Sequence, residues 1–415
     1  MLSRRFLLAG AAVGLPSLAA AQTRPQHPAP RPPAPHPAGA APGRGRRPAE
    51  PVPTGTPANT PIGPLDTAAR WAVVLDFATG ATLLDKDADA SMPPSSMTKL
   101  MTIYIVYSLL KSGRLQLTQE LPVSERAWRM GGSKMFVGIG TQVKVEDLIR
   151  GVIVQSGNDA CIVLAEAIAG SEEQFAELMN QKGKEIGLQN SNFRNATGWP
   201  DPEHRMSVRD IAVLARRLIQ DFPEYYHYDS EKAFKYNNIE QQNRNPLVQK
   251  NLADGLKTGH TDDGGYGLVA SAERSGRRIV LVVNGLNSMR QRAEEGERLL
   301  EWAFREFENV TLFTADQPVE QVPVWLGTQP TVPLVGGRDL VVTMPRGWRN
   351  RAKITLEYDT PVQAPVARGA QLGRLTVIGQ GVPEMQVPLL AGADVPRLGL
   401  PGRAWAVLTH YVTGS

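Results

Sequence analysis

The chain has 415 residues, of which 42% are hydrophobic, and a formal net charge of +4. This length is sufficient for two or three domains, each with its own core. Six of the excess positive charges lie before residue 64, so the rest of the chain has a net charge of −2 and we expect no nucleic-acid partner. The single cysteine, Cys161, excludes an intrachain disulfide and a cysteine-based metal site, and we expect it to be a small buried hydrophobe.

The N-terminus has the pattern of a signal peptide over residues 1–21. A pair of arginines precedes an apolar run from Phe6 to Leu18, and Ala19 to Ala21 form a small-residue cleavage site. The run is too short for a transmembrane span. We therefore expect export to the periplasm, by the general secretory or the twin-arginine route, with association at the outer face of the inner membrane. Residues 22–64 are rich in proline, alanine and arginine, which predicts a disordered tether.

Residues 65–308 are predicted to form the first domain. Two short strands around a glycine turn predict a hairpin, and an apolar run after them predicts a buried helix. Three more helices, two adjacent strands and a charged amphipathic helix follow. These elements span 70–76, 81–84, 100–110, 145–155, 160–169, 171–186, 267–273, 278–283 and 289–307. Strands at both ends with helices between them predict an α/β (α+β) sandwich of antiparallel sheet and helices, and not alternating βαβ units.

Residues 309–396 are predicted to form a small all-β domain, because short strands alternate with glycine and proline turns. The expected strands span 310–313, 322–326, 340–343, 354–358, 374–378 and 385–389. In residues 397–415, Trp405 and Leu408 recur at helical spacing. This predicts an amphipathic helix with weak contact to a membrane surface, and the alternative is a helix docked on its own domain.

Three short motifs stand in order along the chain. Ser96 and Lys99 are three residues apart just before the first buried helix, so a hydroxyl and an amine share one helix face and form a possible nucleophile and base. Ser156-Gly157-Asn158 is a polar break between two apolar helices, and Lys257-Thr258-Gly259 precedes a strand. The ordered trio is far rarer by chance than any one member. It matches the signature of serine β-lactamases and penicillin-binding proteins, with Gly157 where that signature has aspartate.

From about residue 64 to its end, the chain resembles the D-alanyl-D-alanine carboxypeptidases among the low-molecular-mass penicillin-binding proteins. The similar segments are Pro94 to Thr102, Leu148 to Cys161, and Asp254 to Thr261. The resemblance implies a penicillin-binding transpeptidase-like fold and, as substrate, the peptidoglycan stem peptide that ends in D-Ala-D-Ala. It also implies β-lactams as covalent inhibitors and a role in cell-wall synthesis and cell shape, and it implies no cofactor.

The chemistry assigns a role to each motif residue. Ser96 is expected to attack the carbonyl between the two D-alanines and to form an acyl-enzyme. Lys99 can take the Ser96 proton only when neutral, which burial and the second cation, Lys257, would favour. Ser156 is expected to relay a proton to the leaving amine, and Asn158 to bond Lys99 or the substrate amide.

The remaining expected site residues bind the substrate. Lys257 and Thr258 would face its terminal carboxylate, and Gly259 would let the strand approach closely. The resemblance implies an oxyanion hole of the backbone N–H groups of Ser96 and His260. It also aligns Arg292 with the family's carboxylate-binding arginine and Arg244 with a second arginine near the site.

One departure from the family concerns the loop 196–199. Some members carry a histidine where this chain has Thr197, so a deacylation aid at that position is not expected. No cluster of histidine and carboxylate residues with zinc-ligand spacing occurs in the sequence, which argues against a metallo-carboxypeptidase.

Three other functions fit the sequence less well. A DD-endopeptidase would cut crosslinks, but the β domain and the terminal helix favour the carboxypeptidase. A β-lactamase would need a deacylating glutamate that the second motif and residues 196–199 lack. A non-catalytic wall-binding or septal module would keep the fold without needing Ser96.

Overall fold

The computed structural model describes residues 56–350, 352–379 and 382–413. The predicted signal peptide and most of the predicted tether lie outside these described residues. Residues 56–64, which were expected to belong to the tether, are instead ordered. Ala58 is fully buried and pairs with Leu65, and Asn59 pairs with Asp85. Proline removes only its own N–H, so the residues between the prolines still pair with neighbouring backbone.

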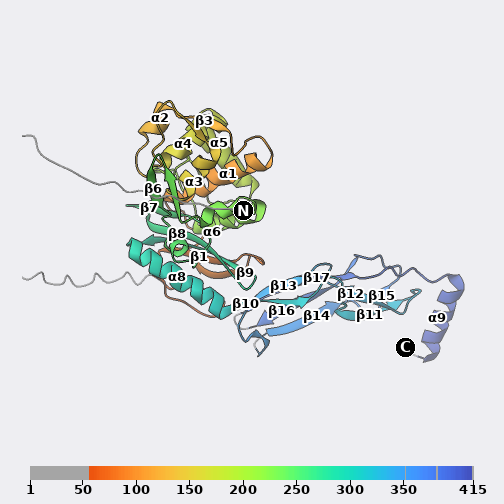
Figure 1. Ribbon diagram of the computed structural model, residues 1–415. Helices are drawn as coiled ribbons and strands as arrows, with labels where there is room; N and C mark the ends of the chain where they lie inside the picture. Colours follow the sequence, from red (N-terminus) through yellow and green to blue (C-terminus); the bar gives the residue numbers. More distant parts are fainter. Residues whose placement is uncertain (1–55, 351, 380–381, 414–415) are drawn as a thin grey trace, which may run out of the picture. The chain divides into compact units, whose positions relative to one another are not determined.

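The first part of the structure is built on a five-stranded antiparallel sheet with the order β2-β1-β9-β8-β7 (Figure 1). Its strands are β1 (Trp71–Asp76), β2 (Thr82–Lys86), β7 (Thr258–Thr261), β8 (Gly265–Arg274) and β9 (Arg277–Leu286). The structure confirms the predicted hairpin and the two predicted central strands. The strand that carries Thr258 and Gly259, β7, lies at one edge of this sheet.

Helices cover both faces of the sheet, because side chains alternate between the faces along each strand. In β1, Val73 belongs to one hydrophobic core and Val74 to another. The amphipathic helix α8 (Met289–Glu306) packs against β8 and β9 on one face. The helix α6 (Val208–Asp221), which was not predicted, packs against β1 and β9 on the other face.

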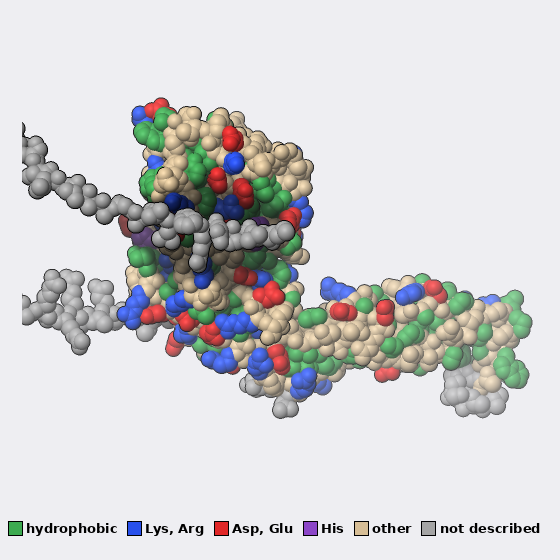
Figure 2. All heavy atoms as spheres, in the orientation of Figure 1, with side chains coloured by type: hydrophobic (Ala, Val, Ile, Leu, Met, Phe, Trp, Pro, Cys, Tyr) green, Lys and Arg blue, Asp and Glu red, His purple; other side chains and the backbone are tan. Residues whose placement is uncertain are grey.

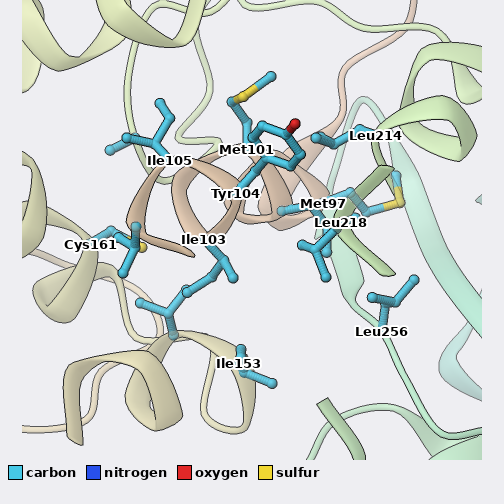
Figure 3. Close-up of a cluster of buried hydrophobic side chains, with 14 of the residues drawn as sticks. Met97, Met101, Ile103, Tyr104, Ile105, Ile153, Cys161, Leu214, Leu218 and Leu256 are labelled. Atoms are coloured by element: carbon cyan, nitrogen blue, oxygen red, sulfur yellow. The ribbon is translucent and has the colours of Figure 1, made fainter. Parts of the chain in front are cut away.

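The helical block between β2 and β7 surrounds the apolar helix predicted after Ser96. Its helices are η1 (Ser95–Thr98), α1 (Lys99–Lys111), α2 (Glu125–Arg129), α3 (Val145–Ile153), α4 (Asn158–Ala169), α5 (Glu172–Glu185), η2 (Tyr226–Ser230) and α7 (Pro246–Gln249). Two short hairpins complete the block, β3 (Glu120–Pro122) with β4 (Gln142–Lys144) and β5 (Ala233–Tyr236) with β6 (Ile239–Gln242). Figure 3 shows Cys161 of α4 and Leu214 of α6 approaching α1 from different sides. Helix α1 is therefore enclosed, and Cys161 is a fully buried core residue as expected.

The second part of the structure is all-β, as predicted. Its strands are β10 (Phe307–Phe313), β11 (Glu320–Trp325), β12 (Thr331–Val335), β13 (Leu340–Pro345), β14 (Ala352–Tyr358), β15 (Val362–Gln363), β16 (Gln371–Gly379) and β17 (Val382–Ala391), with the short helix η3 (Trp348–Asn350). They form a pair, β10-β13, and a sheet with the order β14-β16-β17-β12-β11-β15 around a separate core. The sequence did not predict β12 and β15. Together with the first part, this architecture confirms the predicted fold class.

The C-terminal helix α9 (Leu400–Thr413) forms where an amphipathic helix was predicted. Several of its apolar side chains are exposed: Leu400, Trp405 and Leu408 are 75%, 68% and 58% exposed. In the described ranges no helix combines the length and the apolar character needed to cross a membrane. Figure 2 shows acidic and basic side chains interspersed over the visible face of the protein, without a continuous surface of one sign.

Candidate active site

The structure places the first motif at the start of the enclosed helix. Ser96 lies in the 3₁₀ turn η1 after Pro93 and Pro94, and Lys99 is the first residue of α1. Lys99 Nζ lies 2.7 Å from Ser96 Oγ and donates to the Thr197 carbonyl at 2.7 Å. The three-residue spacing therefore places the Lys99 amine beside the Ser96 hydroxyl, as the sequence predicted.

Burial controls the charge of Lys99. Its side chain is completely inaccessible to solvent, and this desolvation lowers the pKa of Lys99 to about 8. A nearby cation, Arg244, lowers this pKa further. Burial also lowers the pKa of Lys257 well below its ordinary value, with Lys99 as the next cause. With this pKa, roughly a tenth of Lys99 is neutral at pH 7, and only the neutral form can accept a proton.

The second motif lies between α3 and α4. Ser156 has a φ of +60° and lines the same cavity as Ser96. Asn158 begins α4, and its Nδ2 donates to the Gly131 carbonyl at 2.8 Å. Its backbone N–H donates to the Ser133 carbonyl at 2.7 Å. These two bonds tie Asn158 to the loop around 131–133.

The third motif forms one wall of the cavity. Gly259 of β7 lies so close to η1 that a Cβ there would come within 2.2 Å of Ser95 Oγ, which confirms the expected close approach. The side chain of His260 stacks on Tyr266 with a centroid separation of 4.0 Å. Lys257 is buried beside the site, and its Nζ donates to the Thr258 carbonyl at 3.1 Å.

Both predicted arginines reach the cavity, although they come from distant parts of the chain. Arg244 donates from Nη1 to Ser133 Oγ at 2.7 Å. Arg292, in the first turn of α8, is 7% exposed, and its buried Nε has no hydrogen-bond partner among the described residues. Burial lowers the pKa of Arg292 to about 10. A buried guanidinium with an unused donor is suited to bind an anion such as a carboxylate.

The cavity between these elements has a volume of 470 Å³, within the usual range for small-molecule sites. Seven of the ten predicted site residues line it, and Lys99, Asn158 and Lys257 are buried next to it. The lining residues are Ser96, Ser133, Ser156, Arg244, Thr258, Gly259, His260, Tyr266, Met289 and Arg292. In the described ranges no group of three or more His, Cys, Asp or Glu side chains could hold a metal ion.

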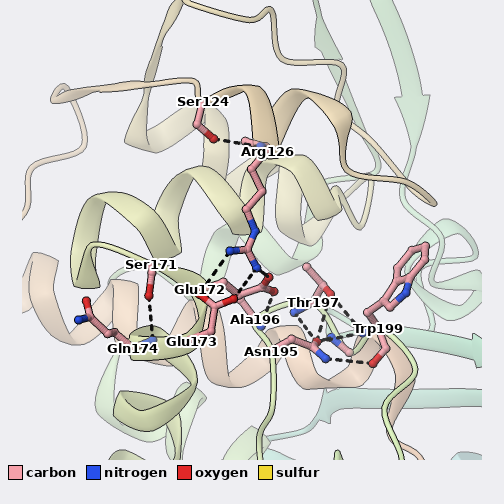
Figure 4. Close-up of polar contacts among 12 residues, drawn as sticks. Ser124, Arg126, Ser171, Glu172, Glu173, Gln174, Asn195, Ala196, Thr197 and Trp199 are labelled. Atoms are coloured by element: carbon pink, nitrogen blue, oxygen red, sulfur yellow. Dashed lines mark hydrogen bonds and ion pairs between the residues drawn. The ribbon is translucent and has the colours of Figure 1, made fainter.

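A polar network behind Lys99 was not predicted (Figure 4). The Glu172 carboxylate accepts the Ala196 N–H at 3.0 Å and pairs with Arg126 at 2.7 Å. Asn195 Oδ1 accepts the N–H groups of the next turn, including that of Gly198 at 2.8 Å. These bonds fix the loop whose Thr197 carbonyl accepts the Lys99 bond. Asn followed by Gly three residues later is a turn pattern that could have indicated the loop.

A second unpredicted carboxylate supports the other wall. Asp159 accepts the backbone N–H groups of Met135 at 2.9 Å and Phe136 at 2.8 Å. Asp159 is fully buried in the first turn of α4, directly after the second motif. It therefore anchors the loop that carries Ser133 to the helix that carries Asn158.

Comparison with known proteins identifies the family. The D-alanyl-D-alanine carboxypeptidase profile matches residues 57–288, and the profile of the penicillin-binding protein 5 C-terminal domain matches residues 307–397. The chain belongs to the D-alanyl-D-alanine carboxypeptidase family. The carboxypeptidase DacC of Escherichia coli is 40% identical over 363 residues, which cover 85% of this chain and 91% of DacC. The predicted family and the predicted enzyme class, a D-Ala-D-Ala carboxypeptidase, are confirmed.

Solved structures agree with this membership of the carboxypeptidase family. Penicillin-binding protein 5 of Haemophilus influenzae is 38% identical, with a TM-score of 0.73 over 81% of this chain and 100% of that one. Penicillin-binding protein D2 of Listeria monocytogenes, solved in its ampicillin-bound form, is 27% identical with a TM-score of 0.53. The match to the Listeria protein covers 58% of this chain and 98% of the Listeria chain.

Proposed function

We propose that this carboxypeptidase works through an acyl-enzyme on Ser96. Ser96 Oγ attacks the carbonyl carbon between the two D-alanines, and its proton passes to Lys99 Nζ. The C–N bond then breaks, the leaving nitrogen takes a proton relayed through Ser156, and free D-alanine departs. Water hydrolyses the remaining ester and restores the serine hydroxyl. The observation that carries this proposal is the 2.7 Å contact between Ser96 and a fully buried lysine.

The substrate is proposed to be the D-Ala-D-Ala end of a peptidoglycan pentapeptide stem. Its terminal carboxylate would lie against Arg292 and Arg244, with Thr258 beside it, because all three residues line the cavity that contains Ser96. The oxyanion would lie against the N–H groups of Ser96 and His260. β-Lactams are proposed to acylate Ser96, and the ampicillin-bound relative supports this.

The proposed domain organisation and cellular location rest on parts of the sequence outside the active site. We infer a signal peptide at 1–21, a tether that ends before residue 56, a catalytic domain at 65–308, a β domain at 309–396 and a terminal helix at 397–415. The exposed apolar residues of α9 support weak contact with a membrane surface. We also propose that the protein acts in the periplasm, at the outer face of the inner membrane, and that it takes part in cell-wall synthesis and cell shape.

The test combines two measurements on the purified protein. A fluorescent penicillin should label Ser96, and a pentapeptide ending in D-Ala-D-Ala should release free D-alanine. Ser96→Ala should abolish both signals, whereas Ser91→Ala, at an exposed serine five residues earlier, should leave both unchanged.

Other outcomes would replace the proposal. Labelling at another residue would overturn the mechanism. Cleavage of crosslinked dimers without release of D-alanine from the pentapeptide would indicate an endopeptidase, and rapid turnover of penicillin would indicate a β-lactamase. Full cellular function of Ser96→Ala would indicate a non-catalytic module.

A further inference from the structure

A buried histidine lies near Lys99 and has no role in the chemistry proposed above. His204 is 3% exposed, and it is close enough to Lys99 for the two groups to interact electrostatically. It is the last residue of the loop 193–204, which is closed by backbone pairing between its two flanking residues. The same loop contains Thr197, whose carbonyl accepts the bond from Lys99 Nζ.

Both ring nitrogens of His204 have a partner. Nδ1 accepts the backbone N–H of Arg194 at 3.1 Å, and Nε2 lies 2.8 Å from Thr98 Oγ1. Because Nδ1 acts as the acceptor, the proton of the neutral ring is on Nε2, which donates it to the Thr98 hydroxyl oxygen. Burial lowers the pKa of His204 to about 4, so the ring is neutral at neutral pH.

The two partners of His204 belong to the two segments that surround the Lys99 amine. Thr98 is fully buried in η1, the turn that carries the nucleophile, and directly precedes the lysine. Arg194 directly precedes Asn195, whose side chain fixes the turn that presents the Thr197 carbonyl (Figure 4). His204 therefore bridges η1 to the loop that supplies this carbonyl.

The loop and η1 touch beside this bridge. A Cβ at Gly198 would lie 1.8 Å from the Ser95 carbonyl oxygen and 2.9 Å from Thr98 Oγ1, so the loop backbone packs directly on the turn. The bond from His204 to Thr98 thus joins the two segments at their contact. Its loss would allow the loop to shift relative to η1.

The position of the loop matters because of the geometry of proton transfer. A neutral lysine amine has two N–H groups and one lone pair. When the Thr197 carbonyl accepts one N–H of Lys99, the amine cannot rotate freely, and its lone pair can stay directed at Ser96 Oγ, 2.7 Å away. Misplacement of a catalytic group by about 1 Å can lower a rate by roughly 100-fold.

We propose that His204 is a positioning residue, which bridges the loop 193–204 to η1 and thereby holds the Thr197 carbonyl against the Lys99 amine. This proposal rests on the proposed acyl-enzyme function and deepens it. His204 does not line the cavity that contains Ser96. Loss of the bridge should therefore slow acylation and leave substrate binding almost unchanged.

The test compares kcat and KM for D-alanine release by the full chain from a pentapeptide ending in D-Ala-D-Ala. His204→Asn keeps an oxygen near the position of Nδ1 for the Arg194 N–H but loses the donor to Thr98. Thr98→Val keeps the shape of the side chain and loses the acceptor. Each variant should lower kcat about tenfold and change KM less than twofold, the pattern of an interaction that acts in the transition state. His227→Asn, at an exposed histidine, should change neither constant.

The double variant shows whether the two residues act through one bond. Because both substitutions remove the same bond, kcat of the double variant should also be about tenfold lower, and not about 100-fold lower. Urea unfolding on the same preparations measures the stability of each variant. If His204→Asn does not fold, the isosteric Thr98→Val still tests the bridge through its own kcat.

Four results would overturn the positioning role. These are a wild-type kcat in the folded single variants even where stability falls, a change confined to KM, a loss of about 100-fold in the double variant, and a loss of similar size in His227→Asn. Failure of the wild-type protein to release D-alanine, or penicillin labelling at a residue other than Ser96, would instead overturn the proposed function.

Discussion

Glu172 should control the rate of acylation although it does not reach the cavity. Its side chain is 9% exposed and accepts the N–H of Ala196, one residue before the carbonyl that binds Lys99. Glu172→Ala leaves that buried N–H without an acceptor, which should destabilise the protein by about 1–3 kcal/mol. It also releases the loop that orients the base. Misplacement of a catalytic group by about 1 Å can lower a rate by roughly 100-fold, so we expect a 10- to 100-fold loss.

Two neighbouring variants separate positioning from general damage. Glu172→Gln keeps a carbonyl oxygen for the Ala196 N–H and should recover most of the acylation rate, although the ion pair with Arg126 is lost. Glu173 contacts the same arginine but is 67% exposed, so Glu173→Ala should change neither property by much.

The assay is the second-order rate constant for labelling by a fluorescent penicillin, with urea unfolding measured on the same preparations. Glu172→Ala should lower both the labelling rate constant and the free energy of unfolding. Glu172→Gln should mainly lower the free energy of unfolding. A wild-type labelling rate in Glu172→Ala would refute the reasoning. Equal rates for the alanine and glutamine variants would show that the Ala196 bond does not transmit the effect.

Three more predictions follow from the site and from α9. Lys99 has to be neutral to accept the proton, and its pKa is about 8. The rate of penicillin acylation should therefore rise roughly tenfold per pH unit between pH 6 and 7.5 and level off above about 8.5. A flat pH profile would exclude Lys99 as the base. Gly259→Ala should lower acylation at least about 10-fold, because the new Cβ would come within 2.2 Å of Ser95 Oγ; labelling at the wild-type rate would contradict the close approach. Replacing both Trp405 and Leu408 by serine should reduce co-sedimentation of the full chain with anionic lipid vesicles and leave D-alanine release in solution unchanged. If the variant sediments as much as the wild-type protein, the membrane contact lies elsewhere.

The sequence predicted contacts that depend on local spacing. Ser96 and Lys99 meet because residues three apart share one helix face. The fold class followed from apolar periodicity in the same way. Arg244 and Arg292 were a different case, since only the resemblance to a family placed two arginines from distant segments beside the same serine.

Contacts to backbone groups were not predictable from side-chain types. Asn158 was expected to bond Lys99 or the substrate amide. Its bond to the Gly131 carbonyl was not foreseen, because the carbonyl of any residue can accept such a bond. Glu172 was missed because its partner is a backbone N–H 24 residues away. The helix α6 was missed although Ser207 caps it by accepting the Asp210 N–H, a local pattern that was available.

Because its one cysteine is buried, modification of that cysteine can be used to measure opening of the protein core. Cys161 is completely inaccessible, and burial raises the pKa of its thiol to about 12, so the folded protein holds almost no thiolate at neutral pH. A thiol reagent can therefore modify the chain only when the core around α1 opens. The modification rate in native buffer measures how often that opening occurs, at a thiol close enough to Lys99 for the two groups to interact electrostatically. No added label and no engineered cysteine is needed to compare the openings of the variants described above.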